Sequence, residues 1–187
     1  GQAGLAASYE LGKRGVEHVV LEKERIGAGW ANRWESFCLV TPNWSVQLPG
    51  FPYDGEDPDG FMPRDEIVAY LERYAASFGC PVRTGANVTG VASDADGNFH
   101  IALAGNETLQ ATNLIVSTGA YQKPYTPPGM HEFPEHVRTM DITEYTCAAD
   151  LPDGDVLIVG SGQTGCQLSE ELSDAGRGVV LACGRAP

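Results

Sequence analysis

Residues 155–185 read DVLIVGSGQTGCQLSEELSDAGRGVVLACGR. A β-branched apolar run leads into Gly160, Gly162 and Gly165, and a helix-like stretch then separates this run from a second one, VVL. In such a unit the first glycine makes the turn, the second admits a pyrophosphate, and the third lets the helix pack on the strand. The helix start offers free N–H groups and a positive dipole end to phosphates. The stretch therefore predicts a dinucleotide-binding unit.

The beginning of the chain repeats this pattern. Residues 1–25, GQAGLAASYELGKRGVEHVVLEKER, match residues 162–185 in starting with G-Q-x-G, breaking at a glycine and ending in VVL. By analogy, Gly1 and Gly4 are the second and third glycines, and we expect the first glycine and its strand to precede this chain. Glycine-rich turns without a ligand are the alternative. The repetition favours two nucleotide sites over that alternative.

The two units end their second strands differently. Glu22 ends the first, and an acid there binds the ribose hydroxyls but repels a 2′-phosphate. The matching position of the second unit holds Ala182 or Cys183, and Arg185 follows with a guanidinium suited to a 2′-phosphate. The sequence thus predicts FAD or NAD on the first unit and NADP on the second. An ordinary exposed arginine is the alternative for Arg185.

Two segments after the first unit differ in character. Residues 27–44 mix aromatic and small residues without helical or strand periodicity, which predicts a long ordered loop. Trp30, Trp34 and Trp44 in this loop could each cover a flavin or belong to the core, and we slightly favour the core. Residues 63–79 predict a packing helix that begins at a proline and ends at a glycine. Its apolar face consists of Ile67, Tyr70, Leu71, Tyr74 and Phe78.

The segment between the two units predicts a small sheet and a crossover. Residues 81–105 contain short alternating runs and an Asp-Gly-Asn turn, which indicates antiparallel strands with His100 on their surface. Residues 113–116 predict a buried strand, and residues 117–119, Ser-Thr-Gly, allow a close approach to a ligand. The proline-rich residues 124–128 predict the crossover between units.

Composition excludes several function classes. The chain has 187 residues and a net charge of −13, which disfavours binding to nucleic acid or to an anionic membrane. No apolar run approaches the roughly 20 residues that span a bilayer. The cysteines form no CxxC pair, so we expect neither a disulfide framework nor a metal site, but reduced thiols in the cytoplasm. The five cysteines are Cys38, Cys80, Cys147, Cys166 and Cys183.

The order of these motifs resembles the flavin-containing monooxygenase family, in particular its bacterial branch of NAD(P)-binding, FAD-dependent oxidoreductases. The resemblance runs along the whole chain. The segment STGAY resembles the ATG motif that the family places against FAD. The residues that carry the resemblance are 1–4, Glu22, 27–30, 33–34, 41–42, 117–121 with Pro124, and 160–165.

The resemblance implies an α/β fold of two Rossmann-like, three-layer dinucleotide-binding domains, truncated at both ends. Residues 1–125 would form the FAD-binding domain, and residues 126–187 would begin the NADPH-binding domain. The residues implied to bind FAD are Gly1, Gly4, Glu22, Gly29, Trp30, Arg33, Val88, Thr118 and Gly119. The residues implied to bind NADPH are Gly160, Ser161, Gly162, Gln163, Thr164, Gly165 and Arg185.

The implied activity is transfer of hydride from NADPH to the flavin, followed by transfer of one oxygen of O2 to a small organic substrate. Val40 stands where the family often carries an asparagine, and residues 133–141 lack the family's glycine and histidine. A reductase or oxidase without oxygen transfer, and a degenerate nucleotide-binding fragment, therefore stay open. No catalytic residue is predicted. We expect the isolated chain to be inactive and prone to aggregation, because parallel sheet edges would be unpaired.

Overall fold

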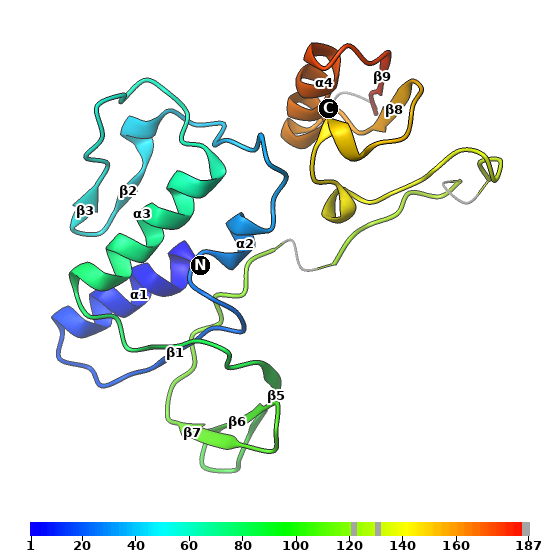
Figure 1. Ribbon diagram of the computed structural model, residues 1–187. Helices are drawn as coiled ribbons and strands as arrows, with labels where there is room; N and C mark the ends of the chain where they lie inside the picture. The colour runs from blue at the N-terminus through cyan, green and yellow to red at the C-terminus, as the bar shows by residue number, and fades with distance from the viewer. Residues whose placement is uncertain (121–122, 130–131, 185–187) are drawn as a thin grey trace.

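The computed structural model describes residues 1–120, 123–129 and 132–184. Figure 1 shows the N-terminal helices grouped in one body, a small sheet below it, and a strand-helix-strand unit that a long extended segment connects to the rest. Among the described residues, no helix has both the length and the apolar character needed to cross a bilayer.

The first predicted unit forms a helix followed by a parallel strand pair. Helix α1 spans Gln2–Lys13 and buries Leu5 against the core. Strand β1, Val20–Leu21, pairs in parallel with β4, Val82–Arg83, and Glu22 continues this ladder by donating its N–H to the Arg83 carbonyl at 3.0 Å. The predicted helix and the strand that ends at Glu22 are confirmed.

Helix α3, Arg64–Ser77, carries the largest apolar core and confirms the helix predicted for residues 63–79. Pro63 caps its start, and Gly79 follows its end at a φ of +63°, which is a conformation that favours glycine. Burial raises the pKa of the Tyr74 phenol to about 12, because the phenolate would lose its hydration. The helix therefore serves as packing.

The loop predicted for residues 27–44 contains two short helical turns, with a small hairpin beyond them. These elements are α2, Ala28–Ala31, and the 3-10 helix η1, Asn43–Ser45, followed by β2, Gln47–Leu48, and β3, Phe51–Pro52. Strands β2 and β3 are antiparallel. The turns are too short to give the sequence a visible helical period, which is why they read as loop.

The three tryptophans of this region lie in different environments. Trp34 is 2% exposed and belongs to the core, as we favoured. Trp30 is partly buried and packs against the core around α3. Trp44 is 57% exposed, so its assignment to the core is wrong. Trp44 lies on η1, just before the β2–β3 hairpin, and its side chain faces solvent. Its neighbours in sequence are covered: Asn43 is buried, and Val46 packs against the core.

The predicted antiparallel sheet is confirmed. It consists of β5, Val88–Ser93, β6, Phe99–Leu103, and β7, Thr108–Ala111, in that spatial order. His100 lies on the partly exposed face of β6, as expected. A paired contact between the Arg83 guanidinium and the Glu107 carboxylate ties this sheet to β4.

The buried strand predicted for residues 113–116 is wrong. These residues join no ladder, and the exposed fractions of Ile115 and Val116 are 58% and 72%. An apolar run becomes a buried parallel strand only where a neighbouring strand and a covering layer receive it. Among the residues that the structure describes, β1 pairs only with β4, and residues 113–116 have no partner strand.

The second unit has the predicted strand-helix-strand form. It follows two 3-10 turns, η2 at Ile142–Glu144 and η3 at Ala148–Asp150. Strand β8, Val156–Val159, leads into helix α4, Gln163–Asp174, and then into β9, Val179–Ala182. β8 and β9 pair in parallel, which is the arrangement that a dinucleotide-binding unit requires.

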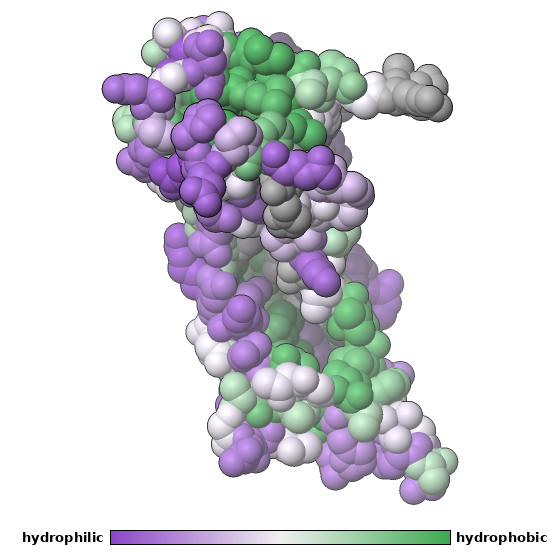
Figure 2. All heavy atoms as spheres, turned by 90° about the vertical axis from the view of Figure 1, so that its right-hand side faces the viewer, coloured by the Kyte–Doolittle hydropathy of each residue, from purple (hydrophilic) through white to green (hydrophobic). Residues whose placement is uncertain are grey.

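One face of this second unit is apolar and exposed. Figure 2 shows apolar side chains gathered over the upper part of the molecule, where β8 and β9 lie. Leu157 and Val180, which face each other across the strand pair, are 48% and 60% exposed, and Val159 is 48% exposed. Such a patch is typical of a sheet face that another layer covers.

Candidate dinucleotide-binding sites

The turn between β8 and α4 fits three glycines of different roles. Gly160 adopts a φ of +119° and still donates its N–H to the Ala182 carbonyl of β9, at 3.0 Å. A Cβ on Gly165 would lie 1.9 Å from the Gly160 carbonyl oxygen, so no larger residue fits. A Cβ on Gly162 would meet no atom within 4 Å. The space in front of the helix is therefore open where a pyrophosphate would lie.

The start of α4 presents polar groups without an opposing charge. Ser161 and Gln163 are exposed and Thr164 is partly exposed, and the first turn of α4 carries no acidic residue. The positive end of the helix dipole is thus free to attract an anion. Cys183 after β9 is not acidic, and Arg185 lies outside the described residues.

The first unit brings three separate segments together at the start of α1. The Glu22 carboxylate oxygen Oε2 lies 3.6 Å from the Gly1 nitrogen, so the strand end reaches the helix start. A Cβ on Gly4 would lie 3.6 Å from the Ser117 Cβ, which places the Ser-Thr-Gly segment against the same turn. Gly119 in that segment has a φ of +79°. Gly1 itself faces open space.

Val88 lies close in sequence to Ala86, which contacts the end of the first unit's strand at Glu22. The Ala86 N–H donates to the Glu22 carbonyl at 2.9 Å, and Val88 follows two residues later at the start of β5. Val88 is 41% exposed, which leaves its surface available to a ligand. The Glu22 oxygen Oε1 meanwhile accepts the Glu24 N–H at 3.2 Å, and this contact fixes the orientation of the carboxylate.

The loop residues Gly29, Trp30 and Arg33 pack beside the first unit. The Trp30 ring centroid lies 5.6 Å from that of Phe37, and the Arg33 guanidinium lies 5.8 Å from the Phe37 centroid. A Cβ on Gly29 would meet nothing within 4 Å. Asn32 donates to the Glu24 carboxylate at 3.4 Å and so holds α2 near the end of β1.

Helix α4 also contacts the loop of the first unit, residues 27–44. These contacts were not predicted from the sequence. The Glu171 carboxylate accepts from the Ser36 hydroxyl at 2.7 Å and from the Tyr145 phenol at 2.8 Å. One helical turn earlier, the Gln167 amide donates to the Cys38 carbonyl at 3.0 Å. The spacing of Gln167 and Glu171 on one helix face was the available signal, but it does not name the distant partner.

Apolar packing surrounds these polar contacts. Trp34, Tyr145 and Leu172 form a buried cluster between the loop and α4. Burial, together with the hydrogen bond to Glu171, raises the pKa of the Tyr145 phenol. Among the described residues, the Trp34 indole nitrogen is buried and has no hydrogen-bond partner. The loop and α4 are thus joined by a packed contact, which we call the Trp34 joint.

A family model described as pyridine nucleotide-disulphide oxidoreductase matches residues 1–187. The chain belongs to this family. An uncharacterized oxidoreductase CzcO-like of Geobacillus kaustophilus is 38% identical over 184 residues, which are 98% of this chain and 52% of that protein. Indole-3-pyruvate monooxygenase YUCCA1 of Oryza sativa subsp. japonica is 36% identical over 177 residues, which are 92% of this chain and 43% of that protein.

A solved structure agrees with these relatives. The flavin-containing monooxygenase of Stenotrophomonas maltophilia superposes with a TM-score of 0.88 at 27% identity, covering all of this chain and 56% of that one. The α/β fold of Rossmann type and the resemblance to flavin monooxygenases are therefore confirmed for this member of the pyridine nucleotide-disulphide oxidoreductase family. The chain spans about half the length of the relatives it matches.

Proposed function

We propose that the protein is an FAD- and NADPH-dependent flavin monooxygenase, which transfers one oxygen atom of O2 to a small organic substrate. The observation that carries the proposal is a difference between the starts of α1 and α4, which both follow a glycine. One has the Glu22 carboxylate 3.6 Å from Gly1, and the other, at Gly162, has no acid in its first turn. Residues 1–125 would hold FAD, and residues 126–187 would begin the NADPH domain.

The residues around α1 fit FAD. The open space at Gly1 accommodates a pyrophosphate, and the nearby Glu22 carboxylate can accept both ribose hydroxyls. Gly4, Thr118 and Gly119 would line the pyrophosphate and flavin side, because a Cβ on Gly4 would lie 3.6 Å from the Ser117 Cβ. The remaining residues that we propose for FAD are Gly29, Trp30, Arg33 and Val88.

The residues around α4 fit NADPH. Gly160 and Gly165 close the turn, and Gly162 leaves room for the phosphates. Ser161, Gln163 and Thr164 would bind the phosphate oxygens, and Arg185 would bind the 2′-phosphate. The bound nicotinamide and flavin supply hydride transfer and oxygen activation, whereas the protein supplies binding, orientation and exclusion of water. The names of the rice and Stenotrophomonas relatives, both monooxygenases, support oxygen transfer.

The FAD assignment is tested by Glu22→Gln in a protein extended to the length of its relatives. FAD affinity, measured by quenching of flavin fluorescence, should fall at least about tenfold, because a carboxylate bound to hydroxyls contributes about 1.5–3 kcal/mol. Glu17→Gln removes the same charge beyond the opposite end of α1 and should leave the affinity unchanged. Equal effects of the two substitutions would contradict the assignment.

The NADPH assignment and the reaction are tested together in the same protein. Arg185→Ala should weaken NADPH at least about tenfold and leave NADH unchanged, because only NADPH carries the 2′-phosphate. With 18O2, a small amine, sulfide or ketone substrate should gain one labelled oxygen for each NADPH oxidised. NADPH oxidation that yields only peroxide across these substrates would favour an oxidase, and a protein without bound flavin would overturn the proposal.

A further inference from the structure

A thiol, a hydroxyl and an imidazole meet beside the middle of α1. The Ser8 hydroxyl oxygen lies 2.7 Å from the His18 nitrogen Nε2 and 3.3 Å from the Cys80 sulfur. Ser8 lies on α1, His18 on the connection to β1, and Cys80 between α3 and β4. Ser8 is 1% exposed, whereas Cys80 and His18 are each partly exposed.

The carbonyl of Val16 fixes the direction of these hydrogen bonds. It lies 2.8 Å from the His18 nitrogen Nδ1, and a carbonyl only accepts, so Nδ1 carries a proton. In the neutral ring, Nε2 is then an acceptor, and the Ser8 hydroxyl donates to it. The Ser8 oxygen in turn accepts from the Cys80 thiol. A proton can therefore pass from Cys80 through Ser8 to His18 without any heavy atom moving.

Cys80 also lines an open cleft. The cleft has a volume of about 240 Å³, and its other lining residues are Ile26, Glu72, Ala75, Ala76, Gly79 and Val82. Most of these side chains are apolar, and the single acid, Glu72, is engaged with Arg25 at 3.5 Å. A small uncharged molecule fits this lining better than an anion, because an anion would meet the Glu72 charge.

We propose that Cys80 is a site of oxidative modification, at which a small uncharged hydroperoxide converts the thiol to a sulfenic acid. The thiol proton passes to Ser8 as the Ser8 proton passes to His18. The sulfur then attacks one peroxide oxygen, an S–O bond forms, and the O–O bond breaks. The leaving oxygen takes a proton from water, and His18 releases its own proton to solvent, so that thiol and hydroperoxide give sulfenic acid and water or an alcohol. The proposal does not depend on the flavin chemistry.

The experiment measures oxidation of each of this chain's five cysteines by hydrogen peroxide, in a protein extended to the length of its relatives. The sulfenic acid is trapped with dimedone and located by peptide mass spectrometry, with exposed Cys166 and Cys183 as internal references. Cys80 should react at least about tenfold faster than either reference, because a positioned proton acceptor commonly contributes about 10²–10⁴-fold. In concentrated urea the advantage should disappear.

Two variants test the proton path. Ser8→Ala removes the hydroxyl, and His18→Asn keeps a donor for Val16 while removing the proton acceptor. Each should slow Cys80 oxidation at least about tenfold without changing the rate at Cys166. His18 is partly exposed, so we expect His18→Asn to fold even if Ser8→Ala lowers stability. Circular dichroism reports the helix content of both variants.

Two matched substitutions serve as controls. Ser77→Ala removes a hydroxyl that is close to Cys80 in sequence and donates to the Tyr74 carbonyl. His100→Asn removes a histidine that contacts Asp94 and Gln110. In both control variants, Cys80 should oxidise at the same rate as in the unsubstituted protein. A Cys80 rate equal to that of Cys166, or an unchanged Cys80 rate in folded Ser8→Ala and His18→Asn, would overturn the proposal.

Discussion

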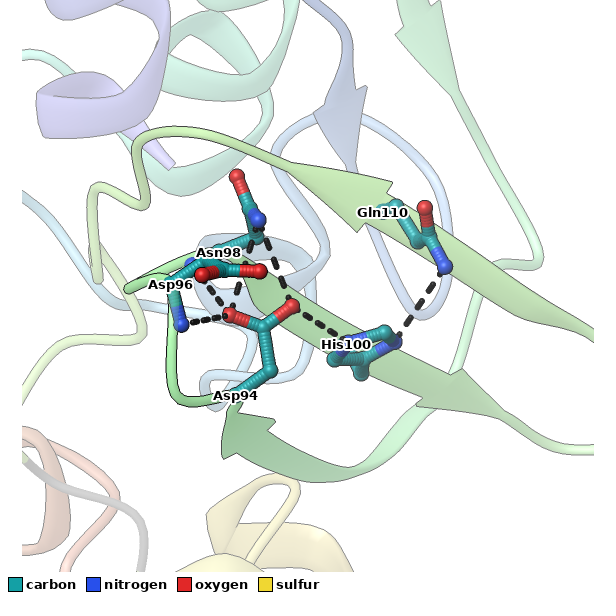
Figure 3. A network of polar contacts seen from close by, with 5 residues as sticks. All are labelled: Asp94, Asp96, Asn98, His100 and Gln110. Carbon is teal, nitrogen blue, oxygen red and sulfur yellow. Dashed lines mark hydrogen bonds and ion pairs between the residues drawn. The ribbon is translucent and has the colours of Figure 1, made fainter.

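At Asp94, one carboxylate organises the turn between β5 and β6. Figure 3 shows it receiving hydrogen bonds from three sides. Oδ1 accepts the N–H groups of Asp96 and Asn98 at 3.0 and 2.9 Å, and Oδ2 lies 3.1 Å from the His100 ring nitrogen Nε2. The Asn98 N–H, more than any other contact, holds the pKa of the Asp94 carboxyl below its usual value.

This lowered pKa predicts an acid-sensitive turn. Since the folded pKa lies below the unfolded value of about 3.9, Asp94 stabilises the turn above that pH, and the contribution is lost as pH falls through the folded pKa. Protection of the Asn98 amide from hydrogen exchange, followed by NMR, should therefore fall at acid pH. Asp94→Asn, which keeps an acceptor oxygen but cannot ionise, should remove this pH dependence; an unchanged dependence would contradict the prediction.

At Tyr145, one phenol holds the Trp34 joint together. Tyr145→Phe should lower the free energy of unfolding by about 1.5–3 kcal/mol, because it removes a hydrogen bond to the Glu171 carboxylate. Urea denaturation gives the measurement. Tyr125→Phe is the control, since Tyr125 is 78% exposed and should change stability by less than about 0.5 kcal/mol. Equal losses in both variants would count against the joint.

Among single residues, the sequence predicts those whose role follows from position in a motif. The three glycines of the second unit and the acid at the end of β1 belong to a fixed spacing, and the structure finds Glu22 beside Gly1. Glu171 has no such spacing. Its partners Ser36 and Tyr145 are remote in sequence and become visible only when the chain is folded.

Among the elements, the β8–α4 turn allows the sharpest test of its glycines. Gly165→Ala should lower the free energy of unfolding by about 3 kcal/mol, because its Cβ would lie 1.9 Å from a backbone oxygen. Gly162→Ala should cost no more than about 1 kcal/mol, since its Cβ faces open space, yet it should weaken NADPH at least about tenfold by filling the phosphate space. Urea denaturation and calorimetry separate the two quantities.

The reverse pattern would contradict these roles. If the Gly162→Ala protein binds NADPH with normal affinity, the phosphates do not lie at Gly162. If the Gly165→Ala protein is as stable as the unsubstituted one, α4 can shift away from β8 at no cost. Gly4→Ala offers a comparison in the first unit, because its Cβ would lie an ordinary 3.6 Å from the Ser117 Cβ.

Elements are predictable where the determining pattern is local. Helix α3 follows from its own proline, glycine and apolar face, and the β5–β7 sheet follows from its turns. Residues 113–116 carry an equally apolar pattern, but burial of a parallel strand depends on a neighbour that the pattern does not contain. The one-turn helix α2 was missed because four residues, Ala28–Ala31, are too few to show a period.

For the whole molecule, the exposed apolar faces predict association of the 187-residue chain in isolation. It should bind a hydrophobic dye and scatter light at micromolar concentration, because Leu157, Val180, Ile115 and Val116 are open to solvent. The double substitution Leu157→Thr and Val180→Thr should slow the scattering severalfold. Val19→Thr, which changes a valine that is 52% exposed in the other unit, should have a smaller effect. A sharp, reversible melt at high temperature would refute the prediction.

The Trp34 joint has a mechanical consequence for this molecule. Helix α4 begins at Gln163, where nucleotide phosphates would meet it, and holds Ser36 through Glu171, about 12 Å further along at 1.5 Å per residue. A helix is stiff over that length, so α4 connects the proposed phosphate site mechanically to the loop that carries Trp30 and Arg33. If a nucleotide that binds at Gln163 tilts α4, we expect Ser36 and this loop to move with the helix.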